Sequence, residues 1–133
     1  MNKTSSLEWM VIAYHNLRSA QILYGADHYT DSIGSDLQQT IEKTLKSILA
    51  FRNLKIPKTH DLYEIYTLID DFLLEEDEIT ILYIATEYYK EDRYPNPNYC
   101  LPEKAEIEEV LHFTENLFDK VCNSLNIELS EIK

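Results

Sequence analysis

Apolar residues recur along this chain three, four or seven positions apart, the spacing that places them on one face of a helix. The first such stretch covers residues 7–24. Thr4, Ser5 or Ser6 is expected to cap its start, and Gly25 is a natural stop. This pattern predicts a long amphipathic helix at the beginning of the chain.

A second helix is predicted from Thr30 or Asp31 to Asn53, because its apolar residues keep the same spacing. Gly34 lies inside this stretch, where glycine costs about 1 kcal/mol relative to alanine. We therefore expect either a close approach of another element at Gly34 or a later start of the helix.

A third helix is predicted after Pro57, with its apolar positions between residues 62 and 72. Thr59 or Asp61 suits its N-cap, and Asp61 with Glu64 has the spacing of a capping box.

Acidic residues 75–78 open the fourth predicted helix, where they complement the helix dipole, and the helix continues to about Lys90. The third and fourth helices form either two units or one bent unit. After the irregular segment 91–100, Pro102 is expected at the first position of the last helix, which reaches Leu125.

No stretch alternates apolar and polar residues as a half-buried strand does, and only two glycines and four prolines occur in 133 residues. We therefore predict an all-α fold, an up-down helical bundle of four to five helices, with residues 1–133 forming a single domain.

The net charge of −12 argues against broad binding to nucleic acid or to a membrane surface. No apolar run is long enough to span a bilayer, and the first residues do not resemble a secretory signal. Two cysteines are too few for a disulfide framework, so a cytoplasmic protein is expected. Charge is unevenly distributed along the chain, however. The stretch from Glu42 to His60 contains five of the twelve basic residues and a single acidic residue, Glu42.

The second predicted helix carries the first candidate site. Gln39, Lys43 and Lys46 share a face there, and together they could hold a phosphate or the edge of a nucleobase. The alternative is a solvated face on which Glu42 and Lys46 form a surface ion pair of little consequence.

Two further segments contribute candidate residues. His60 lies where the third helix starts, a place whose free N–H groups attract anions, although capping alone also explains the segment. Arg93 and Tyr94 precede Pro95 in the irregular segment. Arg93 could pair with a phosphate, or its charge could simply complement the dipole at the end of the preceding helix. Tyr94 could stack on a base, or its ring could simply pack in the core.

Several chemistries have no sequence support. The chain has no glycine-rich phosphate loop, no nucleophile elbow and no His-Glu-x-x-His zinc motif. A di-iron site in a helical bundle needs a Glu-x-x-His motif on each of two helices. Glu109 and His112 form this motif only once in the chain, so His112 is predicted to be an ordinary helix residue. We therefore predict no catalytic residue, no metal site and no cofactor.

Three blocks together resemble the HEPN domain family. They are the Gln38-Gln39-x-x-Glu42-Lys43-x-x-Lys46 string, the Lys58-Thr59-His60-Asp61-Leu62 string, and Arg93-Tyr94-Pro95 before a last helix, and the resemblance covers about Leu7 to Leu125. It implies a bundle of four or five helices, usually a homodimer, similar to the C-terminal domain of kanamycin nucleotidyltransferase.

The resemblance also implies a function. Prokaryotic members often accompany a small nucleotidyltransferase in a two-component, toxin–antitoxin-like module, and nucleotide binding has been proposed for the fold. By this carry-over Lys43, Lys46, His60 and Arg93 surround a cleft. We therefore predict a non-catalytic module that binds a nucleotide, partners a nucleotidyltransferase, or does both.

One departure from the family affects this prediction. Many members are ribonucleases with an arginine followed by a histidine after four to six residues. Here the intervals are nine residues after Arg18, seven after Arg52 and eighteen after Arg93. A divergent metal-independent endoribonuclease and a purely structural dimerisation domain remain the alternatives.

Overall fold

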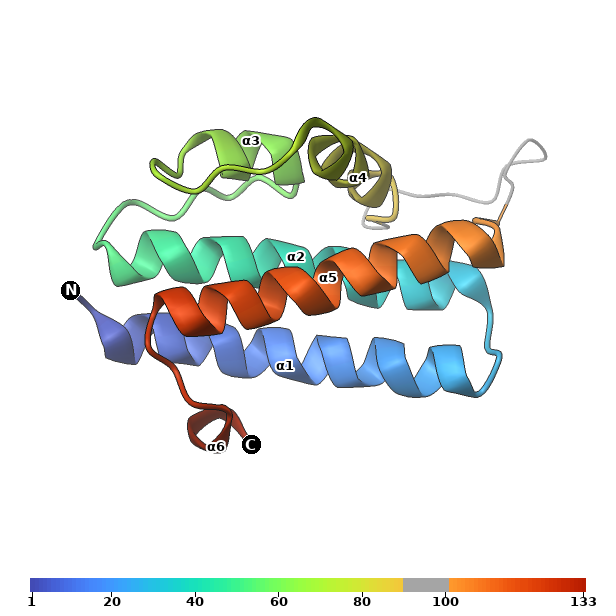
Figure 1. Cartoon of the computed structure of the whole chain (residues 1–133), viewed down its shortest axis with the longest axis horizontal. Coiled ribbons are helices and arrows are strands. Elements are labelled where there is room, and N and C mark those ends of the chain that lie inside the picture. Colours follow the sequence, from blue (N-terminus) through green and yellow to red (C-terminus); the bar gives the residue numbers. More distant parts are fainter. Residues whose placement is uncertain (90–100) are drawn as a thin grey trace.

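The computed structural model describes residues 1–89 and 101–133, and within these residues the secondary structure is entirely helical. The prediction of an all-α helical bundle is confirmed (Figure 1). The helices are α1 (Lys3–Gly25), α2 (Thr30–Phe51), α3 (Leu62–Thr67), α4 (Glu76–Thr86), α5 (Lys104–Ser124) and α6 (Leu129–Ile132).

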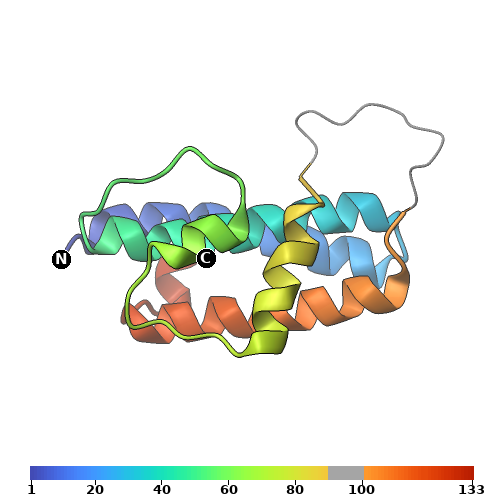
Figure 2. The ribbon, with the colours of Figure 1, turned by 90° about the horizontal axis from the view of Figure 1, so that it is seen from above.

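Three long helices, α1, α2 and α5, lie side by side and form the body of the molecule (Figure 1). The colours show that α2 and α5 run in the same direction and that α1 runs opposite to both. The short helices α3 and α4 pack over α2, and α4 crosses the long helices rather than following them (Figure 2). The third and fourth predicted helices are thus separate units.

Helix α2 is the centre of the core. Its residues Leu37, Ile41 and Leu45 are completely buried, and burial continues almost without interruption from Ile33 to Ala50. This happens because α1, α5 and the α3–α4 pair cover α2 on different sides. The helix therefore buries polar positions as well as its apolar stripe, which the one-sided amphipathic pattern did not predict.

Two helix starts differ from the prediction. Helix α1 begins at Lys3, because the Oδ1 atom of Asn2 accepts a hydrogen bond from the backbone N–H of Ser5 at 3.0 Å and caps the helix earlier than expected. Helix α5 begins at Lys104, so Pro102 lies before the helix and not at its first position.

The other helix ends also differ by a few residues. Helix α2 ends at Phe51 instead of Asn53, and α4 ends at Thr86 instead of about Lys90. Helix α6 is a single turn beyond the last predicted helix. Among the described residues, no helix is both long enough and apolar enough to cross a membrane.

At Gly34, α2 lies close against Tyr88 in the segment after α4. A Cβ atom at Gly34 would lie 2.9 Å from Cγ of Tyr88, which is too close for a carbon–carbon contact. The ring of Tyr88 is buried, and its hydroxyl donates a 2.5 Å hydrogen bond to Glu106 on α5. The expected close approach at Gly34 is confirmed, and it explains a glycine inside a helix.

Candidate functional site

A line of polar side chains on α2 lies beside its apolar stripe. Gln38, Glu42 and Lys46 follow one another at intervals of four residues, so they share one face of the helix. Their exposures are 0%, 1% and 4%. The alternative of a solvated face with a surface ion pair is therefore wrong, because neighbouring elements cover this line.

The carboxylate of Glu42 accepts hydrogen bonds on both oxygens. Its Oε1 atom lies 2.9 Å from Nδ1 of His60 and accepts from Nε2 of Gln38 at 3.1 Å. Its Oε2 atom accepts from Nζ of Lys46 at 3.0 Å and from Nζ of Lys43 at 3.2 Å. Four donors thus converge on one buried carboxylate.

These contacts define the Glu42 cluster, which consists of Gln38, Gln39, Glu42, Lys43, Lys46 and His60. Gln39 belongs to it because its Oε1 accepts from Nζ of Lys43 at 3.2 Å and its Nε2 donates to Oε1 of Gln38 at 2.7 Å. The structure therefore brings together four of the six predicted site residues, Gln39, Lys43, Lys46 and His60.

The electrostatics of the cluster are set by its donors. Burial by itself raises the pKa of the Glu42 carboxyl, because it penalises the charged form. Hydrogen bonds from His60 and Lys46, with the nearby charge of Lys43, outweigh burial and lower this pKa to about 2. The carboxylate is therefore charged at neutral pH, and two ammonium groups against it leave the cluster with net positive charge.

His60 forms the edge of the cluster that reaches solvent. Its side chain is 36% exposed, and its ring stacks on Tyr89 with centroids 4.0 Å apart and planes 16° apart. Its backbone oxygen also accepts from Nε2 of Gln38 at 3.0 Å, so both the ring and the main chain are held in place. The predicted residues Arg93 and Tyr94 lie outside the described residues, and their place in the site stays a prediction.

Trp9 on α1 belongs to the surroundings of the site, although the sequence pattern did not indicate it. The Nζ atoms of Lys43 and Lys46 each lie 5.9 Å from the centroid of its ring, within reach of a cation–π interaction. Its signal in the sequence was weak, although Trp9 is the only tryptophan and directly precedes the buried Met10.

The start of α3 is not a second anion site. The carboxylate of Asp61 accepts from the backbone N–H groups of Tyr63 and Glu64 at 3.0 and 3.2 Å, so the cap occupies the amides that an anion would need. Glu64 does not close the predicted capping box, since its side chain accepts from the hydroxyl of Thr59 instead.

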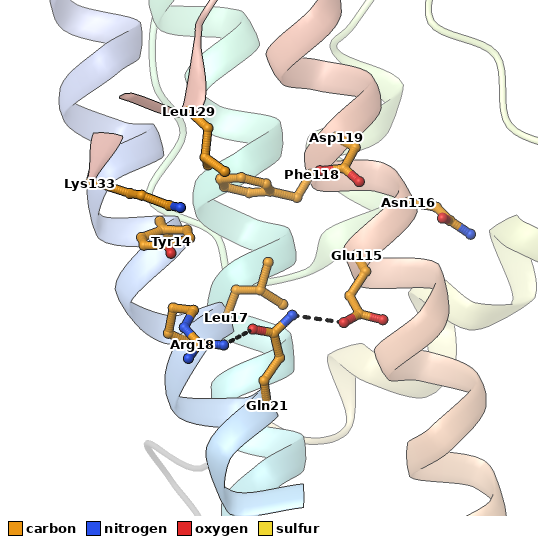
Figure 3. A pocket seen from close by; sticks show the side chains of 10 residues that line it. All are labelled: Tyr14, Leu17, Arg18, Gln21, Glu115, Asn116, Phe118, Asp119, Leu129 and Lys133. Carbon is orange, nitrogen blue, oxygen red and sulfur yellow. Dashed lines mark hydrogen bonds between the residues drawn. The ribbon is translucent and has the colours of Figure 1, made fainter. Parts of the chain in front are cut away.

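A separate hollow of about 600 Å³ lies between α1, α5 and the end of the chain (Figure 3). Leu17 and Phe118 contribute apolar surface to it. Arg18 donates to Gln21 at 2.6 Å, and Gln21 donates to Glu115 at 2.7 Å, so these polar groups already satisfy one another. Two basic and two acidic side chains line it, which gives no preference for an anion.

A metal site has no support in the described part of the chain. Within residues 1–89 and 101–133, no three His, Cys, Asp or Glu side chains gather closely enough to hold an ion. The Glu42 carboxylate is also occupied by donors on both oxygens, so it does not offer lone pairs to a cation.

Comparisons with known proteins agree with this architecture. The family model described as "HEPN domain" matches residues 6–125. The crystal structure of TT1696 from Thermus thermophilus is similar, with a TM-score of 0.75 and 26% identity over 92% of this chain and 98% of that chain. ST0689, an archaeal HEPN homologue, has the same fold, with a TM-score of 0.70 and 17% identity over 94% and 99%. A search of the curated proteins gave no significant match.

Proposed function

The chain belongs to the HEPN domain family, and from this premise we propose that it is a non-catalytic module that binds a nucleotide through the Glu42 cluster and partners a small nucleotidyltransferase. This proposal has a ligand half, which is nucleotide binding, and a partner half, which is association with the nucleotidyltransferase. The ligand half rests on the convergence of four donors on the buried Glu42 carboxylate. This carboxylate fixes two lysines and a histidine at one place before any ligand arrives.

The charge of the cluster supports an anionic ligand. Glu42 neutralises one of its two lysines, and the remaining positive charge lies in a chain of net charge −12. The side chains of Lys43 and His60 are 20% and 36% exposed, so the positive edge of the cluster faces solvent. A phosphate is the anion that such preorganised nitrogen donors bind well.

Aromatic rings next to the cluster favour a nucleotide over free phosphate. Tyr89 lies against His60 on one side, and Trp9 lies near both lysines on the other. Stacking of a base on an aromatic ring contributes about 1–3 kcal/mol. A long nucleic acid fits less well, because the acidic remainder of the chain repels a polyanion.

Calorimetric titration of the purified protein with ATP, GTP and related nucleotides tests the ligand half. We expect binding by the wild type, a loss of at least about tenfold in Lys43→Ala, and no change in Lys104→Ala. Lys104 is a matched control because it is an exposed lysine that pairs with Asp27, outside the cluster. Absence of heat with every nucleotide would refute nucleotide binding.

The partner half has a separate test. Tagged protein expressed in its native host should recover a small nucleotidyltransferase. Recovery of no such enzyme contradicts this half and leaves the ligand half standing.

One observation favours a second candidate, a divergent metal-independent endoribonuclease. The carboxylate of Glu42 lies 2.9 Å from Nδ1 of His60, and a carboxylate in this position orients a histidine for general acid–base work. Incubation with total RNA, beside a His60→Ala variant, separates the two functions. Cleavage that disappears in the variant would replace the binding proposal by this one.

A further inference from the structure

The hollow between α1, α5 and the end of the chain is lined by charges of both signs, and the two signs come from different elements (Figure 3). Arg18 belongs to α1 and Lys133 to the end of the chain, whereas Glu115 and Asp119 both belong to α5. None of these residues belongs to the Glu42 cluster, so the hollow is a separate site. Opposed charges do not select a simple anion, but they complement a ligand that carries a positive and a negative group at once.

The gap between Arg18 and Glu115 is bridged by the side-chain amide of Gln21. Nη1 of Arg18 donates to Oε1 of Gln21 at 2.6 Å, and Nε2 of Gln21 donates to Oε2 of Glu115 at 2.7 Å (Figure 3). A single O–C–N unit with a hydrogen bond at each end therefore spans the gap. The carboxylate and ammonium groups of an α-amino acid are joined by an O–C–C–N unit, which is one bond longer, so such a ligand spans nearly the same gap.

Arg18 and Glu115 both have room for a second bridge beside Gln21. A guanidinium carries five N–H donors, and within the described part of the chain only Nη1 of Arg18 donates a hydrogen bond. The Oε1 atom of Glu115 accepts no hydrogen bond from any residue that the structure describes. A ligand carboxylate can thus pair with the planar fork of Arg18, and a ligand ammonium group with Glu115, while Gln21 stays in place.

Apolar side chains supply the remaining contacts in the hollow. Leu17 and Phe118 are 5% and 2% exposed, so they form a fixed floor, and Leu129 is 44% exposed and has apolar surface left to bury. The volume of about 600 Å³ lies within the range of about 300–1,000 Å³ that is usual for sites of small ligands. A side chain of the size of leucine therefore fits.

We propose that the hollow binds a free α-amino acid with an apolar side chain. Its carboxylate pairs with Arg18 and its ammonium group with Glu115. Its side chain covers the apolar surface of Leu17, Phe118 and Leu129. Because this ligand has no net charge, the charge of −12 on the chain does not repel it, as it would repel an anion.

Saturation-transfer difference NMR with L-leucine at millimolar concentrations tests the proposal. L-Leucine should bind, whereas N-acetyl-L-leucine, which lacks the ammonium group, and L-leucinamide, which lacks the carboxylate, should each bind at least about tenfold more weakly. Glycine should also bind more weakly, because it has no side chain to cover the apolar floor. ε-Aminocaproate should not compete with leucine, because its two charged groups are several bonds further apart.

Two substitutions then locate the site. Arg18→Gln and Glu115→Gln should each weaken leucine binding at least about tenfold. Because Arg18 is exposed and Glu115 is half-buried, both variants should keep the fold, which a thermal melt verifies. Arg52→Gln and Glu109→Gln are the matched controls, since neither residue lines the hollow, and they should leave binding unchanged.

The analogues keep the proposal falsifiable even if a variant does not fold. Absence of leucine binding overturns it, and so does binding of both blocked analogues as strong as that of leucine. Leucine binding that neither Arg18→Gln nor Glu115→Gln weakens also overturns it.

Discussion

Replacing Glu42 with glutamine removes one buried charge and leaves the shape of the side chain nearly unchanged. The carboxylate accepts hydrogen bonds on both oxygens, whereas an amide has one oxygen and presents an NH₂ group to the other donors. The variant therefore leaves two lysine ammonium groups without their shared negatively charged acceptor. Since the site is buried, we expect a loss of stability rather than a rearrangement.

The expected magnitude follows from the pKa of the Glu42 carboxyl. A pKa lowered from 4.5 to about 2 in the folded protein corresponds to about 3 kcal/mol of folding free energy at neutral pH. The unfolded chain takes up the proton first as the pH falls. This contribution is thus complete above about pH 4.5 and disappears as the pH falls through 4.5 toward 2.

Urea unfolding followed by far-UV circular dichroism, at neutral pH and at several acidic values, measures both quantities. Glu42→Gln should lower the free energy of unfolding by about 3 kcal/mol at pH 7. The gap between variant and wild type should shrink below pH 4.5. Glu109→Gln is the control, because Glu109 is exposed on α5 and should change stability by less than about 0.5 kcal/mol. A Glu42→Gln variant as stable as the wild type at pH 7 would refute the reasoning.

Three further substitutions test other parts of the fold. Gly34→Ala should destabilise the protein by about 1–3 kcal/mol, although alanine has the better helix propensity. The reason is that the ring of Tyr88, held by its hydrogen bond to Glu106, occupies the space that the new methyl group needs. A higher melting temperature of the variant contradicts this. Asp61→Ala should cost about 1 kcal/mol in urea unfolding through loss of the α3 cap, and an unchanged midpoint speaks against that role. Burial raises the pKa of the Cys122 thiol to about 11, which lowers the fraction of reactive thiolate. In a Cys100→Ser variant, a thiol reagent at pH 8 should therefore modify the native protein roughly a hundredfold more slowly than the urea-unfolded chain. Equal rates in the two states exclude a buried thiol.

The fold could be predicted from the sequence because helix periodicity and helix caps depend on residues close together in the chain. Asp61 is an example, since its capping role depends on the N–H groups two and three residues away. The ends of helices were less predictable. Asn2 competes with three hydroxyl-bearing neighbours for the cap of α1, and only the folded backbone decides among them.

Only some of the site residues could be predicted from the sequence, because the chemistry of the site depends on which side chains are buried. Lys43, Lys46 and His60 were identified from their positions in two of the three family blocks, but nothing in the local pattern required Glu42 to be buried. That burial arises from α1, which precedes α2 in the sequence, and from the chain before α3, which follows it. Trp9 was missed for the same reason, since its contact with the two lysines spans more than thirty residues.

Because Trp9 is the only tryptophan, its indole N–H gives a single resonance that reports on the lysines beside it. The most direct test of the central claim follows this resonance in ¹H–¹⁵N spectra while ATP is added. We predict a shift that saturates in the wild type and in Lys104→Ala and is lost in Lys43→Ala. An indole resonance that does not move with ATP, or that moves equally in Lys43→Ala, would contradict nucleotide binding at the Glu42 cluster.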